Sequence, residues 1–189
     1  LDLLEHFAVL KGLTDRKQRR EVVDGLLHQV NLWDVRKRKL GGFSGGMRQR
    51  FGIAQALIGN PTLIIVDEPT AGLDPEERNR FNNLLSEIGE NVVVILSTHI
   101  VDDVTDLCPR MAILVGGRIV ATGTPSELIA ALQGRIWQAA IDKHELDAAR
   151  ARQAVIATRL RGGRTVIRVL ADASPGVGFA PAEAGLEDV

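Results

Sequence analysis

The sequence has few of the residues that mark disulfide-stabilised, membrane-spanning or base-stacking proteins. Its one cysteine, Cys108, cannot form an internal disulfide, which fits a reducing cytosol without excluding other compartments. No run of about eighteen apolar residues occurs, so we expect no membrane-spanning helix. Tyrosine is absent and aromatic residues make up only 4% of the chain, which argues against a surface that stacks on nucleic-acid bases.

A lysine that would complete a nucleotide site is also missing. The phosphate loop of many nucleotide-binding proteins reads Gly-x-x-x-x-Gly-Lys followed by Ser or Thr, and this chain contains no Gly-Lys pair. Residues 42–50, GFSGGMRQR, nevertheless place three glycines and a serine directly ahead of an amphipathic helix. Such an arrangement is expected of a phosphate cradle, so the sequence raises the question of what a cradle without a lysine does.

Charge is distributed unevenly although the net charge is only −1. Residues 1–50 contain eleven Lys and Arg against six Asp and Glu, whereas residues 51–110 contain three against ten. The basic runs at 16–20 and 36–39 could contact phosphate or anionic lipid headgroups, but such runs more often form solvated helix and loop surface. A length of 189 residues and a hydrophobic content of 45% predict one globular domain with room for a small appendage.

The spacing of apolar residues and the capping residues predict a series of helices. In the first, Leu3, Phe7 and Leu10 recur at helical spacing and are expected to face the core. Asp74 followed by Pro75 is a strong helix start, because an acidic N-cap and a proline at the first helical position both favour it. The expected helices cover residues 2–12, 14–30, a stretch from the glycine cluster to 58, a stretch from 75 through Ile88, 100–107 and 124–132.

Continuous apolar runs predict strands buried in a parallel sheet. Residues 62–68, TLIIVDE, suit a strand covered on both faces, and residues 91–98 suit a second one. A third strand at 111–115 is followed by Gly116-Gly117, which turns the chain into a hairpin partner. Strands that alternate with helices indicate an α/β architecture, whose functional loops lie at the carboxyl ends of the strands.

The pattern changes after about residue 134. Residues 135–141 are expected to form a strand, and residues 154–170 two strands joined at Gly162-Gly163. We therefore expect residues 135–189 to form a small α+β appendage, separate from an α/β portion that covers residues 1–134, with its helical part at about 1–60 and its sheet core at about 61–134.

Three polar residues follow the two predicted core strands. Asp67 and Glu68 end the first strand, and His99 comes just after the second. Parallel neighbours would bring them into one crevice, where one acid can serve a magnesium ion and the other can accept a proton from water. Each signal alone is weak, because an acidic pair often caps a strand, a lone histidine is usually a surface residue, and Ser-Gly-Gly is commonly a turn with an N-cap.

The joint order of these motifs resembles the ATP-binding cassette (ABC) ATPases over about residues 1–133. FSGGM at 43–47 resembles the family's signature motif, usually LSGGQ, with Phe43 for Leu and Met47 for Gln. LIIVDE at 63–68 resembles the Walker B strand, AGLD at 71–74 the D-loop, and STH at 97–99 the switch-histidine loop. The resemblance implies a P-loop NTPase-like parallel sheet with a helical segment that carries the signature.

The resemblance also implies roles for individual residues. Glu68 would be the general base and His99 the γ-phosphate switch, with Asp67 associated with Mg²⁺. Asp74 would be a contact at a dimer interface. The signature residues Ser44, Gly45, Gly46 and Met47 would contact the ATP held by a second cassette, paired head to tail with the first. That pairing explains the missing lysine, because the signature completes its partner's site.

The resemblance further implies a subunit that hydrolyses ATP to power a membrane transporter, of the drug or antibiotic exporter type. Its partners would be a membrane permease and a second ATPase subunit, in a homodimer at the cytoplasmic face of the cell membrane, with no nucleic acid bound. The phosphate loop, the aromatic adenine-stacking loop and the glutamine loop have no counterpart here. We therefore expect a fragment that begins after the glutamine loop, is cut at both ends and is inactive alone.

Two other hypotheses stay open at this point. A ribosome- or nucleic-acid-associated ABC ATPase would make use of the two basic runs. Against it, relatives of the ribosomal type more typically have Asn-His where this chain has Ala71-Gly72, and chromosome-associated relatives insert a long coiled coil that is absent here. The third hypothesis is that the chain as it stands is a non-catalytic interaction module.

Overall fold

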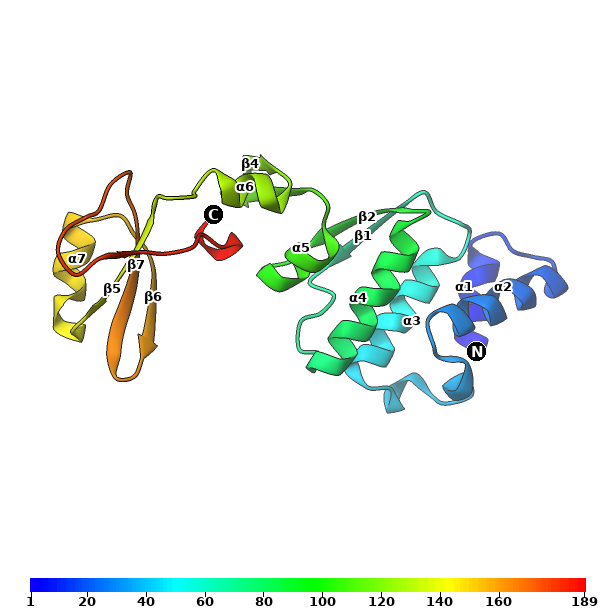
Figure 1. The fold of residues 1–189 in the computed structure, drawn as a ribbon. Helices are drawn as coiled ribbons and strands as arrows, with labels where there is room; N and C mark the ends of the chain where they lie inside the picture. The colour runs from blue at the N-terminus through cyan, green and yellow to red at the C-terminus, as the bar shows by residue number, and fades with distance from the viewer. The chain divides into compact units, whose positions relative to one another are not determined.

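The computed structural model describes all 189 residues and divides into two compact units, Leu1–Leu107 and Cys108–Val189 (Figure 1). The expected boundary near residue 134 differs from this division, because the hairpin after residue 110 packs with the helix that follows it rather than pairing with the parallel strands. The assignment of 1–134 to an ATPase domain stays a prediction. None of the helices is long and apolar enough to cross a membrane.

The first unit places its helices against one face of a two-stranded parallel sheet. Two short 3₁₀ turns, η1 (Trp33–Val35) and η2 (Leu40–Gly42), connect the second helix to the third. The regular elements are α1 (Asp2–Leu10), α2 (Arg16–Gln29), α3 (Gly45–Leu57), β1 (Leu63–Asp67), α4 (Pro75–Gly89), β2 (Val93–Ser97) and α5 (Val101–Leu107).

The helices form where the apolar spacing predicts them, but in α1 only Phe7 of the three residues expected to face the core packs against it. Leu4 and Ala8 are fully buried, whereas Leu3 is 41% and Leu10 69% exposed. The stripe of Leu4 and Ala8 is buried because α2 and α3 both pack on the side of α1 that carries these two residues. In α4 the expected core face is confirmed, since Phe81, Leu84, Leu85 and Ile88 are all buried.

Strands β1 and β2 pair in parallel from Leu63 opposite Val93 to Asp67 opposite Ser97, which confirms the predicted pairing. The expectation that β1 is buried on both faces is wrong for this chain. The uncovered face exposes apolar side chains of both strands, with 46% of Leu63, 69% of Ile65, 64% of Val93 and 51% of Ile95 accessible. The strand at 111–115 does not join this sheet.

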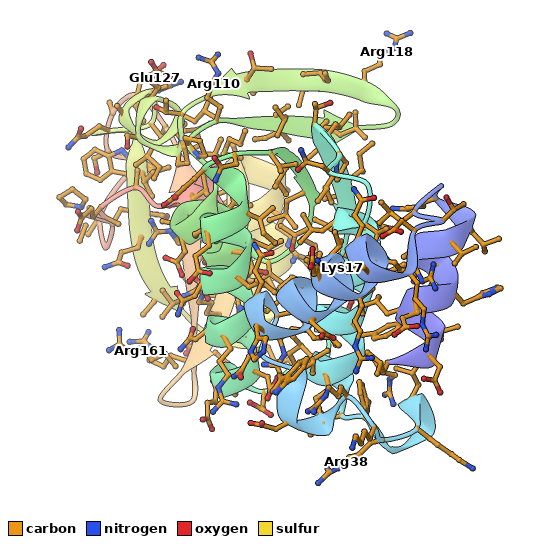
Figure 2. The ribbon with its side chains drawn as sticks, turned by 90° about the vertical axis from the view of Figure 1, so that its right-hand side faces the viewer. Lys17, Arg38, Arg110, Arg118, Glu127 and Arg161 are labelled. Atoms are coloured by element: carbon orange, nitrogen blue, oxygen red, sulfur yellow. The ribbon has the colours of Figure 1, made fainter.

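The second unit is built on antiparallel strands. β3 (Met111–Val115) and β4 (Arg118–Gly123) form the predicted hairpin, and Figure 2 shows Arg118 pointing away from the ribbon. The main sheet has the order β6-β7-β5-β8, with α7 against it through Leu146 and Ala149. The remaining elements are α6 (Pro125–Ala130), β5 (Ile136–Ile141), η3 (Lys143–Glu145), α7 (Leu146–Arg152), β6 (Val155–Arg161), β7 (Arg164–Leu170), β8 (Ala180–Pro181) and η4 (Leu186–Asp188).

Candidate functional site

The parallel pairing of β1 and β2 brings their polar carboxyl ends together. Asp67 and Ser97 are opposite each other in the register, and the Ser97 hydroxyl donates a hydrogen bond to the Asp67 carboxylate. One residue further, the backbone N–H of Glu68 donates to the carbonyl of Ser97 at 2.9 Å. This bond extends the pairing of β1 with β2 one residue beyond Asp67 and Ser97, so it fixes the backbone from which the Glu68 side chain projects.

Glu68 adopts an unusual backbone conformation. Its φ of +46° lies in the left-handed region, which is uncommon for residues other than glycine and costs on the order of 1 kcal/mol. The conformation ends β1 and turns the chain toward Thr70. Such strain persists where neighbouring contacts hold it, and here the bond to Ser97 does so.

The Glu68 side chain meets His99, as the strand adjacency predicts. Nδ1 of His99 lies 2.7 Å from Oε1 of Glu68, which is hydrogen-bonding distance. The second carboxylate oxygen, Oε2 of Glu68, is buried and has no hydrogen-bond partner. An unpaired buried oxygen costs free energy, which a hydrogen bond from a donor such as a water molecule would offset.

The signature segment forms the N-terminus of α3. Ser44 is the N-cap, and its hydroxyl accepts a hydrogen bond from the backbone N–H of Met47 at 3.2 Å. Ser44 and Gly45 are exposed, whereas Gly46 is buried and Met47 is half-buried. A side chain at Gly46 would meet the Glu77 carboxylate, so glycine suits that position. The exposed helix N-terminus favours an anion, as the sequence predicts.

Asp74 caps α4 and has a clear structural role. Its side chain accepts a hydrogen bond from the backbone N–H of Glu77 at 2.9 Å. The Glu77 carboxylate lies 3.4 Å from the guanidinium of the buried Arg50 on α3, so it links the first turn of α4 to the second turn of α3. This arrangement holds the signature segment next to the predicted D-loop, but it leaves the proposed dimer contact of Asp74 untested.

The predicted site residues form two separate groups. Asp67, Glu68 and His99 gather at the strand ends, whereas Ser44 to Met47 and Asp74 gather at the starts of α3 and α4. No hydrogen bond or ion pair joins a residue of one group to a residue of the other. No set of three or more acidic, His or Cys side chains lies close enough to hold a metal ion without other ligands.

A buried carboxylate that no sequence pattern indicates, Asp103, bonds to the turn that follows Glu68. Asp103 is fully buried and accepts hydrogen bonds from the Thr70 hydroxyl at 2.5 Å, from Nε of Arg78 at 2.8 Å and from the Asn82 amide at 3.2 Å. Burial alone would raise the pKa of Asp103, but these hydrogen bonds and the charge of Arg78 lower the pKa below its ordinary value of 3.8.

Through Asp103, α5 is tied both to α4 and to the turn that follows Glu68. Asp103 lies 33 residues from Thr70 and 25 from Arg78 in the sequence, so no local pattern predicts these contacts. The network therefore fixes the turn that positions Glu68 against the helix that follows His99.

Comparisons with known proteins find similarity to ATP-binding proteins of ABC transporters. The family profile described as "ABC transporter" matches residues 2–71. The chain is 38% identical over 124 residues to the Nod factor export ATP-binding protein I of Rhizobium etli, covering 65% of this chain and 39% of the relative. It is 36% identical over 124 residues to the linearmycin resistance ATP-binding protein LnrL of Bacillus subtilis, covering 65% of this chain and 40% of the relative.

A solved structure has the same fold. The CbiO1 protein of Clostridium perfringens, part of the ABC transporter complex CbiONQ, superposes with a TM-score of 0.61 at 29% identity, covering 67% of this chain and 51% of that one. The chain thus spans about two fifths of the length of the two export and resistance relatives, as their 39% and 40% coverage shows. Sequence match, fold and motif order agree: residues 2–71 match the ABC transporter family, and the chain is similar in sequence and fold to ATP-binding proteins of ABC transporters.

Proposed function

We propose that the complete domain containing this chain binds and hydrolyses ATP as a subunit of an ABC transporter. The observation that carries the proposal is the contact of Glu68 with His99 across the carboxyl ends of two parallel strands, at 2.7 Å. In open parallel sheets this edge is where ligands bind. A carboxylate oxygen without a partner at the same place supplies an acceptor for an attacking water molecule.

Each residue has a distinct part in the proposed hydrolysis. The oxygen of water forms a bond to the γ-phosphorus, the bond from that phosphorus to the β–γ bridging oxygen breaks, and Glu68 takes the water's proton. His99 holds Oε1 of Glu68, which leaves Oε2 free to accept that proton. Because Nδ1 of His99 is engaged, Nε2 is the ring nitrogen that would accept a hydrogen bond from a water molecule or, when the ring is protonated, donate one to a phosphate oxygen.

The strand ends also fit a magnesium ion shared with nucleotide phosphates. Asp67 is exposed at the end of β1, and the Ser97 hydroxyl beside it orients its carboxylate. Mg²⁺ in phosphate-transfer sites is usually held by one or two carboxylates together with waters and substrate oxygens, so a single protein carboxylate suffices. When bound, the ion neutralises charge on the phosphates, and Asp67 is the residue of this chain that would hold it.

The separation of the signature from the strand ends supports a head-to-tail dimer. Ser44 and Gly45 are exposed at a helix N-terminus, but neither contacts Glu68 or His99. We propose that these residues and Met47 contact the ATP of a second subunit, with Asp74 at the same interface. A membrane permease at the cytoplasmic face would complete the assembly. The names of the linearmycin resistance and Nod factor export relatives favour export.

The test is steady-state ATP hydrolysis by the complete domain with Glu68→Gln. The amide keeps the size of the side chain but cannot accept the proton, so turnover should fall by about 10²–10⁴-fold, the usual contribution of a general base. ATP binding should be retained, and a long-lived closed dimer should accumulate. His99→Ala should likewise lower hydrolysis more than binding.

Glu87→Gln is the matched control, because Glu87 is exposed on α4 and forms no ion pair. It should leave turnover unchanged. If Glu68→Gln hydrolyses ATP at the wild-type rate, Glu68 is not the base. If the complete domain co-purifies with ribosomes or DNA rather than a permease in a nucleotide-dependent way, the transporter proposal is wrong.

A further inference from the structure

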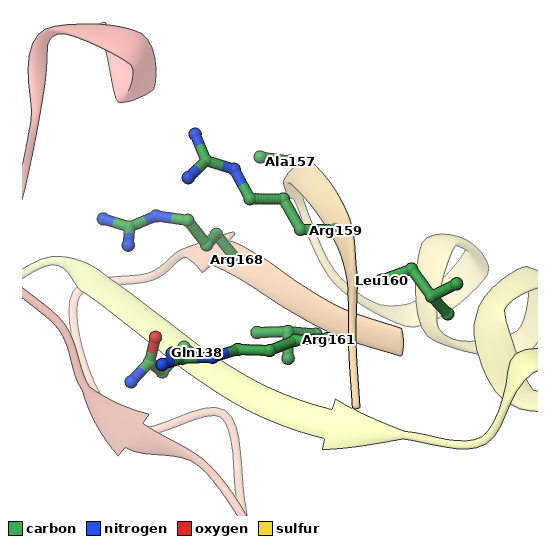
Figure 3. A pocket seen from close by; sticks show the side chains of 7 residues that line it. Gln138, Ala157, Arg159, Leu160, Arg161 and Arg168 are labelled. Carbon is green, nitrogen blue, oxygen red and sulfur yellow. The ribbon is translucent and has the colours of Figure 1, made fainter. Parts of the chain in front are cut away.

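One face of the main sheet in the second unit carries a group of arginines. The register places Arg159 of β6 opposite Val166 of β7, and Arg168 of β7 opposite both Ala157 of β6 and Gln138 of β5. Arg161, two residues after Arg159, lies on the same face because side chains alternate along a strand. Figure 3 shows Arg159, Arg161 and Arg168 projecting on the same side of the sheet as Gln138.

Like charges on neighbouring strands destabilise a sheet unless anions lie between them. In this structure the chain itself supplies two. Asp188 accepts from Nε of Arg168 at 2.7 Å and from its Nη2 at 2.6 Å, and the Asp188 side chain is only 3% exposed. Glu187 forms an ion pair with Arg159. The acidic turn of residues 185–188 therefore occupies part of the arginine face.

The contacts of the acidic turn and the residues just before it are those of a bound peptide and not of an isolated anion. Besides the Asp188 carboxylate, Nη2 of Arg168 donates to the backbone carbonyl of Glu183, two residues before the turn, at 2.6 Å. Asp188 also accepts from the backbone N–H of Gly185 at 2.8 Å, which closes the turn. One guanidinium thus contacts a carboxylate and a main-chain carbonyl of one short segment, residues 183–188.

The acidic turn leaves the rest of the face open. Arg161 forms no hydrogen bond or ion pair, and Gln138 forms none through its side chain. Together with Leu160 and Val166 they line a hollow of about 330 Å³ beside the two paired arginines. The hollow is large enough for additional side chains, and its free guanidinium selects a negative one.

We propose that the arginine face, formed by Arg159, Arg161, Arg168 and Gln138, is a docking site for an acidic peptide segment of a partner protein. The acidic turn occupies the site in cis, and the partner displaces it. A partner segment with one more carboxylate than the turn would also reach Arg161. Because the turn competes, the apparent affinity for the partner is reduced in proportion to the fraction of molecules in which the site is free.

The test is fluorescence anisotropy with the 189-residue chain and a labelled peptide that repeats Glu-Asp-Gly. Replacing the competing carboxylates by Glu187→Gln with Asp188→Asn should tighten binding about tenfold, because the cis occupant is weakened. Glu187→Gln alone should tighten binding about threefold, the effect of losing one exposed ion pair. This single variant leaves the buried Asp188 in place, so it tests competition even if the double variant folds poorly.

Arg161→Gln in the Glu187→Gln background should weaken the acidic peptide about fivefold or more, since Arg161 is free to pair with it. Arg118→Gln is the matched control, because Arg118 is an exposed strand arginine of the same unit without an ion pair. It should change the affinity little, and a matched Gln-Asn-Gly peptide should not bind.

Three outcomes would overturn the proposal. One is an equal loss from Arg118→Gln and Arg161→Gln, which would mean non-specific charge attraction. Another is unchanged affinity in both acidic-turn variants, which would mean that the turn does not compete. The third is Arg161-dependent binding to phosphatidylserine-containing vesicles with no binding of the peptide, which would assign the face to a lipid surface.

Discussion

The two sheets of this chain bury their side chains in different ways. In β1, Ile64 is 5% exposed while its neighbours Leu63 and Ile65 are 46% and 69% exposed, although all three are apolar. In β7, the alternation of buried Ile167 with half-exposed Arg168 matches an alternation of apolar and charged residues. Only in the second sheet does the pattern of apolar and charged residues match the face that other parts of the 189 residues cover.

The difference follows from how the two kinds of sheet are covered. A parallel sheet usually has helices on both faces, so its strands are apolar throughout. In this chain, however, helices cover only one face of the parallel sheet. An antiparallel sheet can face water on one side, and here that side carries the arginine face and α7 covers the other. The first sheet therefore depends on further cover, whereas the second does not. Four measurements test this comparison.

The largest expected effect concerns nucleotide binding by residues 1–189 alone. Asp67 and Glu68 place negative charge at the strand ends, and the chain has no phosphate loop whose lysine and backbone N–H groups would balance a triphosphate. Isothermal titration with Mg-ATP should give a Kd of about 1 mM or weaker, roughly a thousandfold above the micromolar range. Micromolar binding would show that the strand ends of the first sheet are a sufficient site.

Removing a core side chain from the second sheet should be costly. Ile167 is fully buried between the sheet and α7, so Ile167→Ala should lower the free energy of unfolding of this unit by about 2–5 kcal/mol in chemical denaturation. Ile65→Ala in the first sheet is the control and should change stability by less than about 0.5 kcal/mol. Equal losses would contradict the difference in cover.

Acid should destabilise the first unit through Asp103. Its pKa is lower in the folded chain than its ordinary value of 3.8, so the charged carboxylate adds stability above that pH. This contribution disappears as the pH falls through the lower folded value. Asp103→Asn should flatten the pH dependence of unfolding below about pH 5, where an ordinary aspartate starts to bind a proton while Asp103 of the folded chain stays charged. Asp102→Asn, whose side chain is 83% exposed, should keep the wild-type profile.

The smallest change in stability is expected on the uncovered face of the first sheet. Ile65→Thr combined with Ile95→Thr should alter the free energy of unfolding by less than about 0.5 kcal/mol per site. Self-association measured by light scattering should nevertheless decrease, because contiguous exposed apolar surface favours aggregation. Unchanged scattering together with a large loss of stability would mean that this face is already covered.

Much of the fold follows from local patterns in the sequence. Asp15, Ser44, Asp74 and Thr124 all cap helices, since short polar side chains satisfy the free N–H groups of a first turn wherever they occur. The hairpin at Gly162-Gly163 is equally local. The face of α1 could not be predicted in this way, because Leu3, Leu4 and Phe7 offer two apolar stripes and only the neighbouring helices choose between them.

The candidate site, too, was predictable from the sequence only in part. That Asp67, Glu68 and His99 follow apolar strands is readable in the sequence, and the rule that parallel neighbours end at one edge brings them together. The roles of these residues stay predictions. The unpaired oxygen of Glu68 and its left-handed backbone are properties of the folded turn, which no residue pattern specifies.

The sequence by itself determined the order of motifs, the capped helices, the pairing of β1 with β2 and the similarity to the ABC transporter family. These depend on spacing along the chain, on local hydrogen bonding or on the adjacency of consecutive strands. Only the tertiary structure decided that Asp103 joins Thr70 and Arg78, that one face of the first sheet is open, and that residues 185–188 lie on the arginine face. Each of these joins segments distant in the sequence or depends on which surfaces are covered, and packing sets both.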